Sequence, residues 1–108
     1  MELKDKIEMY KEKKNFVDTV SKAFEDLRNT NVEKITYEIF TKDFNGEPYF
    51  REYVVVHFKG GAISTRTCTG NSNSANYRTI GNLIDGGYYS EVEDYKSMED
   101  CGFKLVEF

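Results

Sequence analysis

The fold of this chain is decided by residues 33–58, which read EKITYEIFTKDFNGEPYFREYVVVHF. In both halves of the stretch apolar and polar side chains alternate, which is the period of a half-buried β-strand. The halves are separated by Asn45-Gly46, a pair typical of a two-residue hairpin turn because both of its residues need a positive φ. The stretch therefore predicts an antiparallel hairpin of strands 33–44 and 47–58.

A two-residue turn also sets the register of the hairpin, because it determines which residues lie opposite each other. The expected pairs are Ile35 with Val56 and Tyr37 with Val54 on one face, and Phe40 with Arg51, Glu38 with Tyr53 and Thr36 with Val55 on the other.

A third strand is expected over residues 62–69, after a second tight turn at Gly60-Gly61. The expected pairs are Phe58 with Ile63 and Val56 with Thr65.

Residues 3–29 predict an amphipathic helix, whose apolar stripe contains Leu3, Tyr10, Val17 and Phe24. Charged residues interrupt the stripe at 11–14, and Asn15 is a helix-capping residue, so a break near residues 14–15 is an alternative. A continuous helix would be about 40 Å long. We expect residues 1–14 to fray as a solvated helix start or to project as an arm. Such an arm would pack on a partner or on a second copy of the chain, giving a homodimer.

The sequence after residue 69 predicts two further helices and a last strand. The order α-β-β-β-α-α-β indicates one α+β domain over residues 1–108, with a long N-terminal helix, an antiparallel three- to four-stranded meander sheet and two C-terminal helices. We expect the helices to pack on one face of the sheet. The first of these helices, over about residues 74–85, is supported by the apolar residues Tyr77, Ile80, Leu83 and Ile84. The second, over about residues 88–100, is supported by Tyr88, Val92, Tyr95 and Met98, with Gly102 as its C-cap. Residues 103–108 are expected to form the last strand, whose neighbour in the sheet is left open.

The composition excludes several classes of protein. Of the 108 residues, 39% are apolar and 15% aromatic, which is too many for a disordered chain. No apolar run approaches the roughly 18 residues that a membrane helix needs, so no membrane partner is expected. The formal net charge of −4 argues against non-specific coating of nucleic acid. Charges run through the first fourteen residues, so we expect no signal peptide and a cytoplasmic location.

No motif for catalysis, a cofactor or a metal is found in the sequence. His57 is the single histidine and has no carboxylate two or four residues away, so a Ser-His-Asp arrangement is not indicated. Cys68 and Cys101 are 33 residues apart, fit no metal spacing and are expected to be reduced, structural thiols. The alternative is a small enzyme or ligand-binding domain on the sheet face expected to carry His57, Ser64, Arg66 and Cys68.

The segment 66–78 is the first unusual feature, because it places hydroxyl and amide side chains between two arginines at the start of a helix. Backbone N–H groups and the helix dipole at such a point attract anions. We expect either capture of a phosphate or carboxylate or a loop whose polar groups satisfy one another. The candidate residues are Arg66, Asn71, Ser72, Asn73, Ser74 and Arg78.

The order α-β-β-β-α over about residues 16–85 resembles the double-stranded-RNA-binding domain. In that family the loop before the last helix carries glycine, serine and a lysine cluster that grips phosphates, and Gly70, Ser72 and Ala75 lie roughly at those positions. The resemblance implies a nucleic-acid-binding domain that uses the 66–78 loop. At the lysine positions this chain has asparagine and serine, which disfavours a nucleic-acid partner.

The acidic segment 85–100 is the second unusual feature. Residues 1–69 carry equal numbers of positive and negative side chains, so the whole excess of negative charge lies in the last third of the chain. An acidic patch with interleaved tyrosines suits a basic protein surface, although a solvated helix face is the alternative. The candidate partner-binding residues are Asp85, Tyr88, Tyr89, Glu91, Glu93, Asp94, Tyr95, Glu99 and Asp100.

A second resemblance rests on the short acidic α+β chain and on the run from Gly70 to Asn76 that leads to Gly86-Gly87-Tyr88-Tyr89. In these features the chain resembles small proteins carried by phages and mobile elements, among them anti-CRISPR proteins, which inhibit a nuclease effector by direct binding. The resemblance implies a non-enzymatic protein-binding inhibitor whose partner is a nucleic-acid enzyme with a basic surface.

Overall fold

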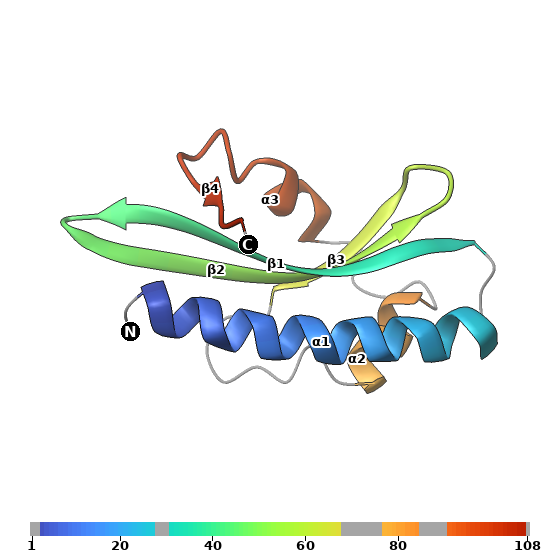
Figure 1. Ribbon diagram of the computed structural model, residues 1–108. Coiled ribbons are helices and arrows are strands. Elements are labelled where there is room, and N and C mark those ends of the chain that lie inside the picture. The colour runs from blue at the N-terminus through green and yellow to red at the C-terminus, as the bar shows by residue number, and fades with distance from the viewer. Residues whose placement is uncertain (1–2, 28–30, 68–76, 85–90, 108) are drawn as a thin grey trace.

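The computed structural model describes residues 3–27, 31–67, 77–84 and 91–107 (Figure 1). It confirms the α+β class, with a four-stranded antiparallel sheet in the order β3-β2-β1-β4. The elements are α1 (Leu3–Leu27), β1 (Val32–Phe44), β2 (Glu47–Phe58), β3 (Ile63–Thr67), α2 (Tyr77–Ile84), α3 (Val92–Lys96) and β4 (Lys104–Leu105).

The hairpin of β1 and β2 forms as the sequence predicts. Asn45 and Gly46 both have positive φ, 54° and 84°, as the two-residue turn requires. The register agrees for every expected pair: Ile35 with Val56, Tyr37 with Val54, Phe40 with Arg51, Glu38 with Tyr53 and Thr36 with Val55.

The expected register of β3 is wrong by one residue. The turn contains three residues rather than two, since the Phe58 N–H donates to the Ala62 carbonyl and Gly61 adopts a φ of 90°. Because a slip of one residue exchanges the two faces of a strand, Ser64 and Arg66 lie on the opposite face from the one expected. The observed pairs are His57 with Ile63, Val56 with Ser64, Val55 with Thr65, Val54 with Arg66 and Tyr53 with Thr67.

Helix α1 is continuous, so the alternative of a break near residues 14–15 is wrong. Its 25 residues span about 38 Å, and the 13 residues of β1 span about 44 Å, so the hairpin is long enough to cover the whole helix. Lys6 and Tyr10 are buried accordingly. The expectation that the start of the helix projects is therefore not met for the described residues 3–14, which lie along the hairpin (Figure 1).

A buried charge cluster holds this part of α1 on the sheet. Glu52 of β2 is 1% exposed and forms ion pairs with Lys6 and Lys13, which occupy positions on the apolar stripe of α1. Tyr37 donates to the same carboxylate at 2.5 Å. Burial alone would raise the pKa of Glu52, but the hydrogen bonds from Lys6 and Tyr37 and the charge of Lys13 lower it below its usual value.

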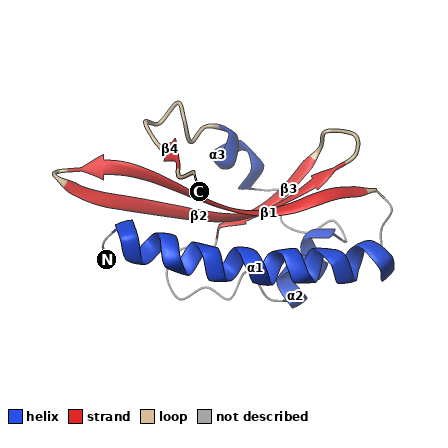
Figure 2. Cartoon of the chain, in the orientation of Figure 1, coloured by secondary structure: helices blue, strands red, loops and turns tan. Residues whose placement is uncertain are grey.

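The expectation that all helices pack on one face is wrong, because α1 and α2 cover one face and α3 covers the other (Figure 2). The reason lies in β2, where residues 53–56 are apolar on both faces and completely buried. A strand that is apolar on both faces needs cover on both sides. The first face buries the large core, which includes Val17, Val20, Val54, Ile80 and Leu83; the second buries Phe40, Tyr53, Val55 and Met98.

The C-terminal elements differ in length from the expectation. In α2, the side chains of Ile80, Leu83 and Ile84 are buried as predicted. The third helix has only five residues, followed by turns up to Gly102, whose φ is 91°. Strand β4 pairs with β1, with Leu105 opposite Phe40, on the side of β1 away from β2.

No helix within the described ranges is long and apolar enough to cross a membrane.

Candidate functional site

Helix α3 is held on the sheet by aromatic and sulfur contacts. The Tyr95 ring packs edge-on against Phe40 and Tyr53, with ring centroids 5.8 and 5.4 Å apart. Met98 is buried, and its sulfur accepts hydrogen bonds from the Tyr53 hydroxyl and from Arg51. These contacts use the inward side of α3 and of the turns after it, so the outward side is left for solvent or a partner.

Two residues of the predicted acidic site have structural contacts. The Tyr95 hydroxyl shares its one proton between both oxygens of Glu38, which lie 3.1 and 2.9 Å away. Burial together with the Glu38 charge raises the pKa of Tyr95. The Glu91 carboxylate accepts a hydrogen bond from the backbone N–H of Thr67 at the end of β3. Both residues thus position α3 against the sheet.

The exposed part of the predicted site consists of four carboxylates, two on α3 and two on the turn that follows it. None of them forms an ion pair with another described residue, which leaves their charge available. The exposed residues are Glu93, Asp94, Glu99 and Asp100. The remaining members of the predicted set, Asp85, Tyr88 and Tyr89, lie outside the described residues.

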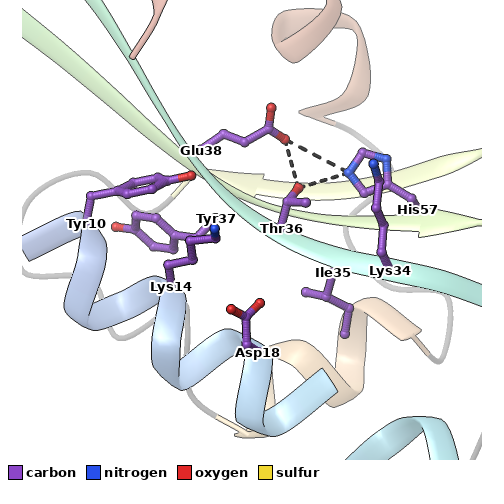
Figure 3. Close-up of a pocket in the computed structure, with 9 residues that line it drawn as sticks. All are labelled: Tyr10, Lys14, Asp18, Lys34, Ile35, Thr36, Tyr37, Glu38 and His57. Carbon is purple, nitrogen blue, oxygen red and sulfur yellow. Dashed lines mark hydrogen bonds and ion pairs between the residues drawn. The ribbon is translucent and has the colours of Figure 1, made fainter. Parts of the chain in front are cut away.

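A pocket of about 270 Å³ lies between α1 and β1 (Figure 3). Tyr10, Lys14 and Asp18 of α1 face residues 34–38 of β1, with His57 of β2 at one end. Burial and the nearby Glu38 and Asp18 raise the pKa of Tyr10 to about 12, so its hydroxyl stays protonated at neutral pH. The lining therefore combines lysines, carboxylates and hydroxyls.

On the side of this pocket that lies away from α1, Thr36 connects His57 to Glu38 (Figure 3). The Thr36 hydroxyl donates to Glu38 at 2.9 Å, and its oxygen lies 2.9 Å from His57 Nε2. Because a hydroxyl has one proton, His57 must donate from Nε2 to Thr36. Glu38 lies 4.0 Å from the same nitrogen rather than from Nδ1, so the arrangement is not that of a catalytic triad.

Spacing along the chain does not reveal Glu38 as a neighbour of His57, because the two residues are 19 positions apart and not two or four. The hairpin register contains the signal, since Glu38, Thr36 and Lys34 follow one another on the strand face that His57 shares. Burial lowers the pKa of His57, partly offset by the charge of Glu38. His57 is therefore neutral at pH 7.

The alternative site on one sheet face is not assembled. His57 lies on the α3 face, whereas Ser64 and Arg66 lie on the α1 and α2 face because of the register of β3. Cys68 lies outside the described residues, and Cys101 is an exposed free thiol rather than a core residue. No group of three histidine, cysteine or carboxylate residues that could hold a metal is found in the described ranges.

The expected anion-binding loop can be placed only at its ends. Arg66 is half-buried on β3, and Arg78 lies in the first turn of α2. Asn71, Ser72, Asn73 and Ser74 lie outside the described residues.

Comparisons of this chain with protein-family models, with curated proteins and with solved structures found no match.

Proposed function

We propose that this protein is a non-enzymatic protein-binding module that docks its acidic surface on a basic protein. The acidic surface is formed by Glu93, Asp94, Glu99 and Asp100 of α3 and the following turn. In this proposal the partner is a nucleic-acid enzyme in the cytoplasm, and the protein acts as an inhibitor of the anti-CRISPR type, encoded by a phage or mobile element.

The observation that carries the proposal is the exposure of these four carboxylates, none of which forms an ion pair with a described residue. Lys96 of α3 is the single lysine among them, so the surface keeps an excess of negative charge. Clustered charge of one sign steers a partner of opposite charge and speeds encounter. The contacts of Tyr95 and Met98 with the sheet keep α3 in place before a partner arrives. The carboxylates are thus presented by a docked element.

The test is an affinity purification from the native cells with three baits. The first is the wild-type protein, and the second carries Glu93→Gln with Asp94→Asn. The third is a matched control with Glu12→Gln and Glu25→Gln, which removes two exposed carboxylates from α1 instead. We expect the wild type and the control to retain the same basic nucleic-acid enzyme, more strongly at low salt, and the α3 variant to lose it. Equal retention by all three baits at low and high salt would contradict the proposal.

A second candidate is a domain that binds duplex RNA through Arg66, Arg78 and the loop between them. It is favoured by the packing of α1 and α2 on the same face of a meander sheet, in the order that resembles the double-stranded-RNA-binding domain. Titration with duplex RNA at about 50 mM salt tests it, because backbone-driven binding is strongest at low salt. An absence of binding under these conditions rules this candidate out.

A further inference from the structure

The tip of the hairpin contains an apolar pocket beside the acidic surface. Lys42 and Phe44 of β1, Tyr49 of β2 and Phe103, just before β4, line a volume of about 190 Å³. Pockets that hold small-molecule ligands measure roughly 300–1,000 Å³. The tip pocket is therefore of a size for one side chain rather than for a whole ligand.

Exposed apolar side chains gather on this side of the sheet. Phe44 is 63% exposed, Tyr49 47% and Leu105 41%. Leu105 lies opposite Phe40, so its side chain points to the α3 face, which Lys42, Phe44 and Tyr49 share by the alternation of the strands. Among the described residues the remaining large exposed apolar side chain is Phe16 of α1. Exposed apolar surface grouped in this way marks an interaction site.

Three of the four side chains that line the tip pocket have contacts that hold them in place. The Asn45-Gly46 turn joins the two strands directly beside it. The Tyr49 and Phe103 rings pack with centroids 5.8 Å apart, and the Lys42 ammonium donates to the Cys101 carbonyl at 3.0 Å. A preformed pocket loses little entropy when a partner binds, which favours affinity.

In residues 42–49 and 99–104, which contain the lining residues, carboxylates outnumber the cations, which are Lys42 itself and Lys104 after Phe103. Glu99 and Asp100 directly precede Cys101, and Glu47 lies opposite Phe44 at the turn. The one cation in the lining, Lys42, is held by the Cys101 carbonyl and lies 5.3 Å from the centre of the Phe103 ring. An apolar pocket with an acidic rim is complementary to an apolar side chain flanked by lysine or arginine.

We propose that the tip pocket receives one apolar side chain of the basic partner, with flanking lysine or arginine side chains paired to Glu99 and Asp100. This inference rests on the proposed function and adds an anchor to it. The acidic surface then attracts the partner, and the tip pocket selects the segment that docks.

The probes are two lysine heptapeptides, one with a central phenylalanine and one with a central alanine, titrated by calorimetry. At about 150 mM salt, where screening acts beyond about 8 Å, we expect the phenylalanine peptide to bind about tenfold more tightly. Phe44→Ser and Tyr49→Ser should each bring that ratio close to one. Phe16→Ser, the same change on α1, should leave the ratio unchanged. In NMR spectra of the wild type, the phenylalanine peptide should shift the signals of Phe44, Tyr49 and Phe103, which tests the site without any variant.

The two proposals fail in different ways. If both peptides bind the wild type equally at low salt and no signal of the tip pocket shifts, the pocket inference is overturned while the acidic docking surface stands. If neither peptide binds at low salt, both proposals are overturned. If the phenylalanine peptide is preferred but Phe44→Ser and Tyr49→Ser keep the preference, the tip pocket is not the anchor.

Discussion

The two faces of the sheet bury different kinds of core. On the first face, α1 and α2 cover a large core that is mainly aliphatic and contains the ion cluster of Glu52 with Lys6 and Lys13. On the second face, the five-residue α3 and the turns after it cover a smaller core that consists of two aromatic side chains, Val55 and Met98.

The difference lies in how completely each face is covered. A 25-residue helix runs along the first face and buries side chains from Lys6 to Val20. On the second face Phe44, Tyr49 and Leu105 remain exposed beside a group of carboxylates. The first face thus holds the fold together, and the second provides the surface that we assign to a partner.

The largest expected effect on the free energy of unfolding comes from a change in the first face. Glu52→Gln removes the carboxylate between Lys6 and Lys13 and leaves their charges uncompensated, so we expect a loss of about 3 kcal/mol in the free energy of unfolding. Urea denaturation measures it. Glu8→Gln is the control, because Glu8 forms an exposed pair with Lys11 at 3.9 Å and should cost less than about 0.5 kcal/mol. Similar losses for both variants would contradict the role of the cluster.

The second largest effect on stability is expected from a cavity under α3, and it should separate local unfolding of the second face from unfolding of the whole protein. Met98→Ala leaves a cavity under α3 and should cost about 2 kcal/mol. Hydrogen exchange should show lost protection at the Phe103 amide, which donates to the Met98 carbonyl, while the amides of the hairpin stay protected. Leu83→Ala on the first face is the counterpart and should lower protection throughout. If Met98→Ala lowered the hydrogen-exchange protection of all amides, the two faces would unfold together, which would contradict the distinction drawn between them.

A smaller effect is expected at the contact between α3 and the edge of β1. Tyr95→Phe keeps the ring against Phe40 and Tyr53 but removes the hydrogen bond that the hydroxyl shares between the two oxygens of Glu38. The free energy of unfolding should therefore fall by about 1.5 kcal/mol. Thermal unfolding measures the loss. Unchanged stability would mean that the ring packing alone holds α3.

The smallest expected effect concerns the dependence of the free energy of unfolding on pH. Because the pKa of His57 is lowered in the folded protein, the unfolded chain binds a proton more readily, and stability falls as pH drops from about 6.5 through the folded-state pKa. His57→Gln should reduce the loss of stability between about pH 7.5 and pH 5 by less than about 1 kcal/mol, since a full unit is worth about 1.4 kcal/mol and the ring is partly screened. Urea denaturation at both pH values measures the loss. An unchanged or steeper loss in the variant would show that other groups cause it.

Part of the candidate site is readable from the chain. Glu93, Asp94, Glu99 and Asp100 belong to the acidic segment that the charge distribution singles out, and the structure leaves them exposed. Tyr95 belongs to the same segment but is tied to Glu38, which is 57 residues away. Local charge predicts which segment is acidic, but contacts between distant residues decide which members of it are available.

The tip pocket brings together residues that are distant in the sequence, and it depends on the packing of β4 and of the turn before it. Phe44 and Tyr49 are close through the hairpin, but Phe103 reaches them only because β4 pairs with β1. The sequence indicated a last strand and left its neighbour open. A two-residue strand has too little pattern to select one.

The sequence by itself determined the α+β class, the hairpin and its register, because Asn45-Gly46 and the alternation around it act over neighbouring residues. Only the tertiary structure decided the register of β3, since adjacent glycines allow either a two- or a three-residue turn. It also decided the pairing of Glu52 with Lys6 and Lys13, and the division of the helices between the two faces. These features depend on burial and on contacts between distant segments, which arise only when the helix and the sheet pack together.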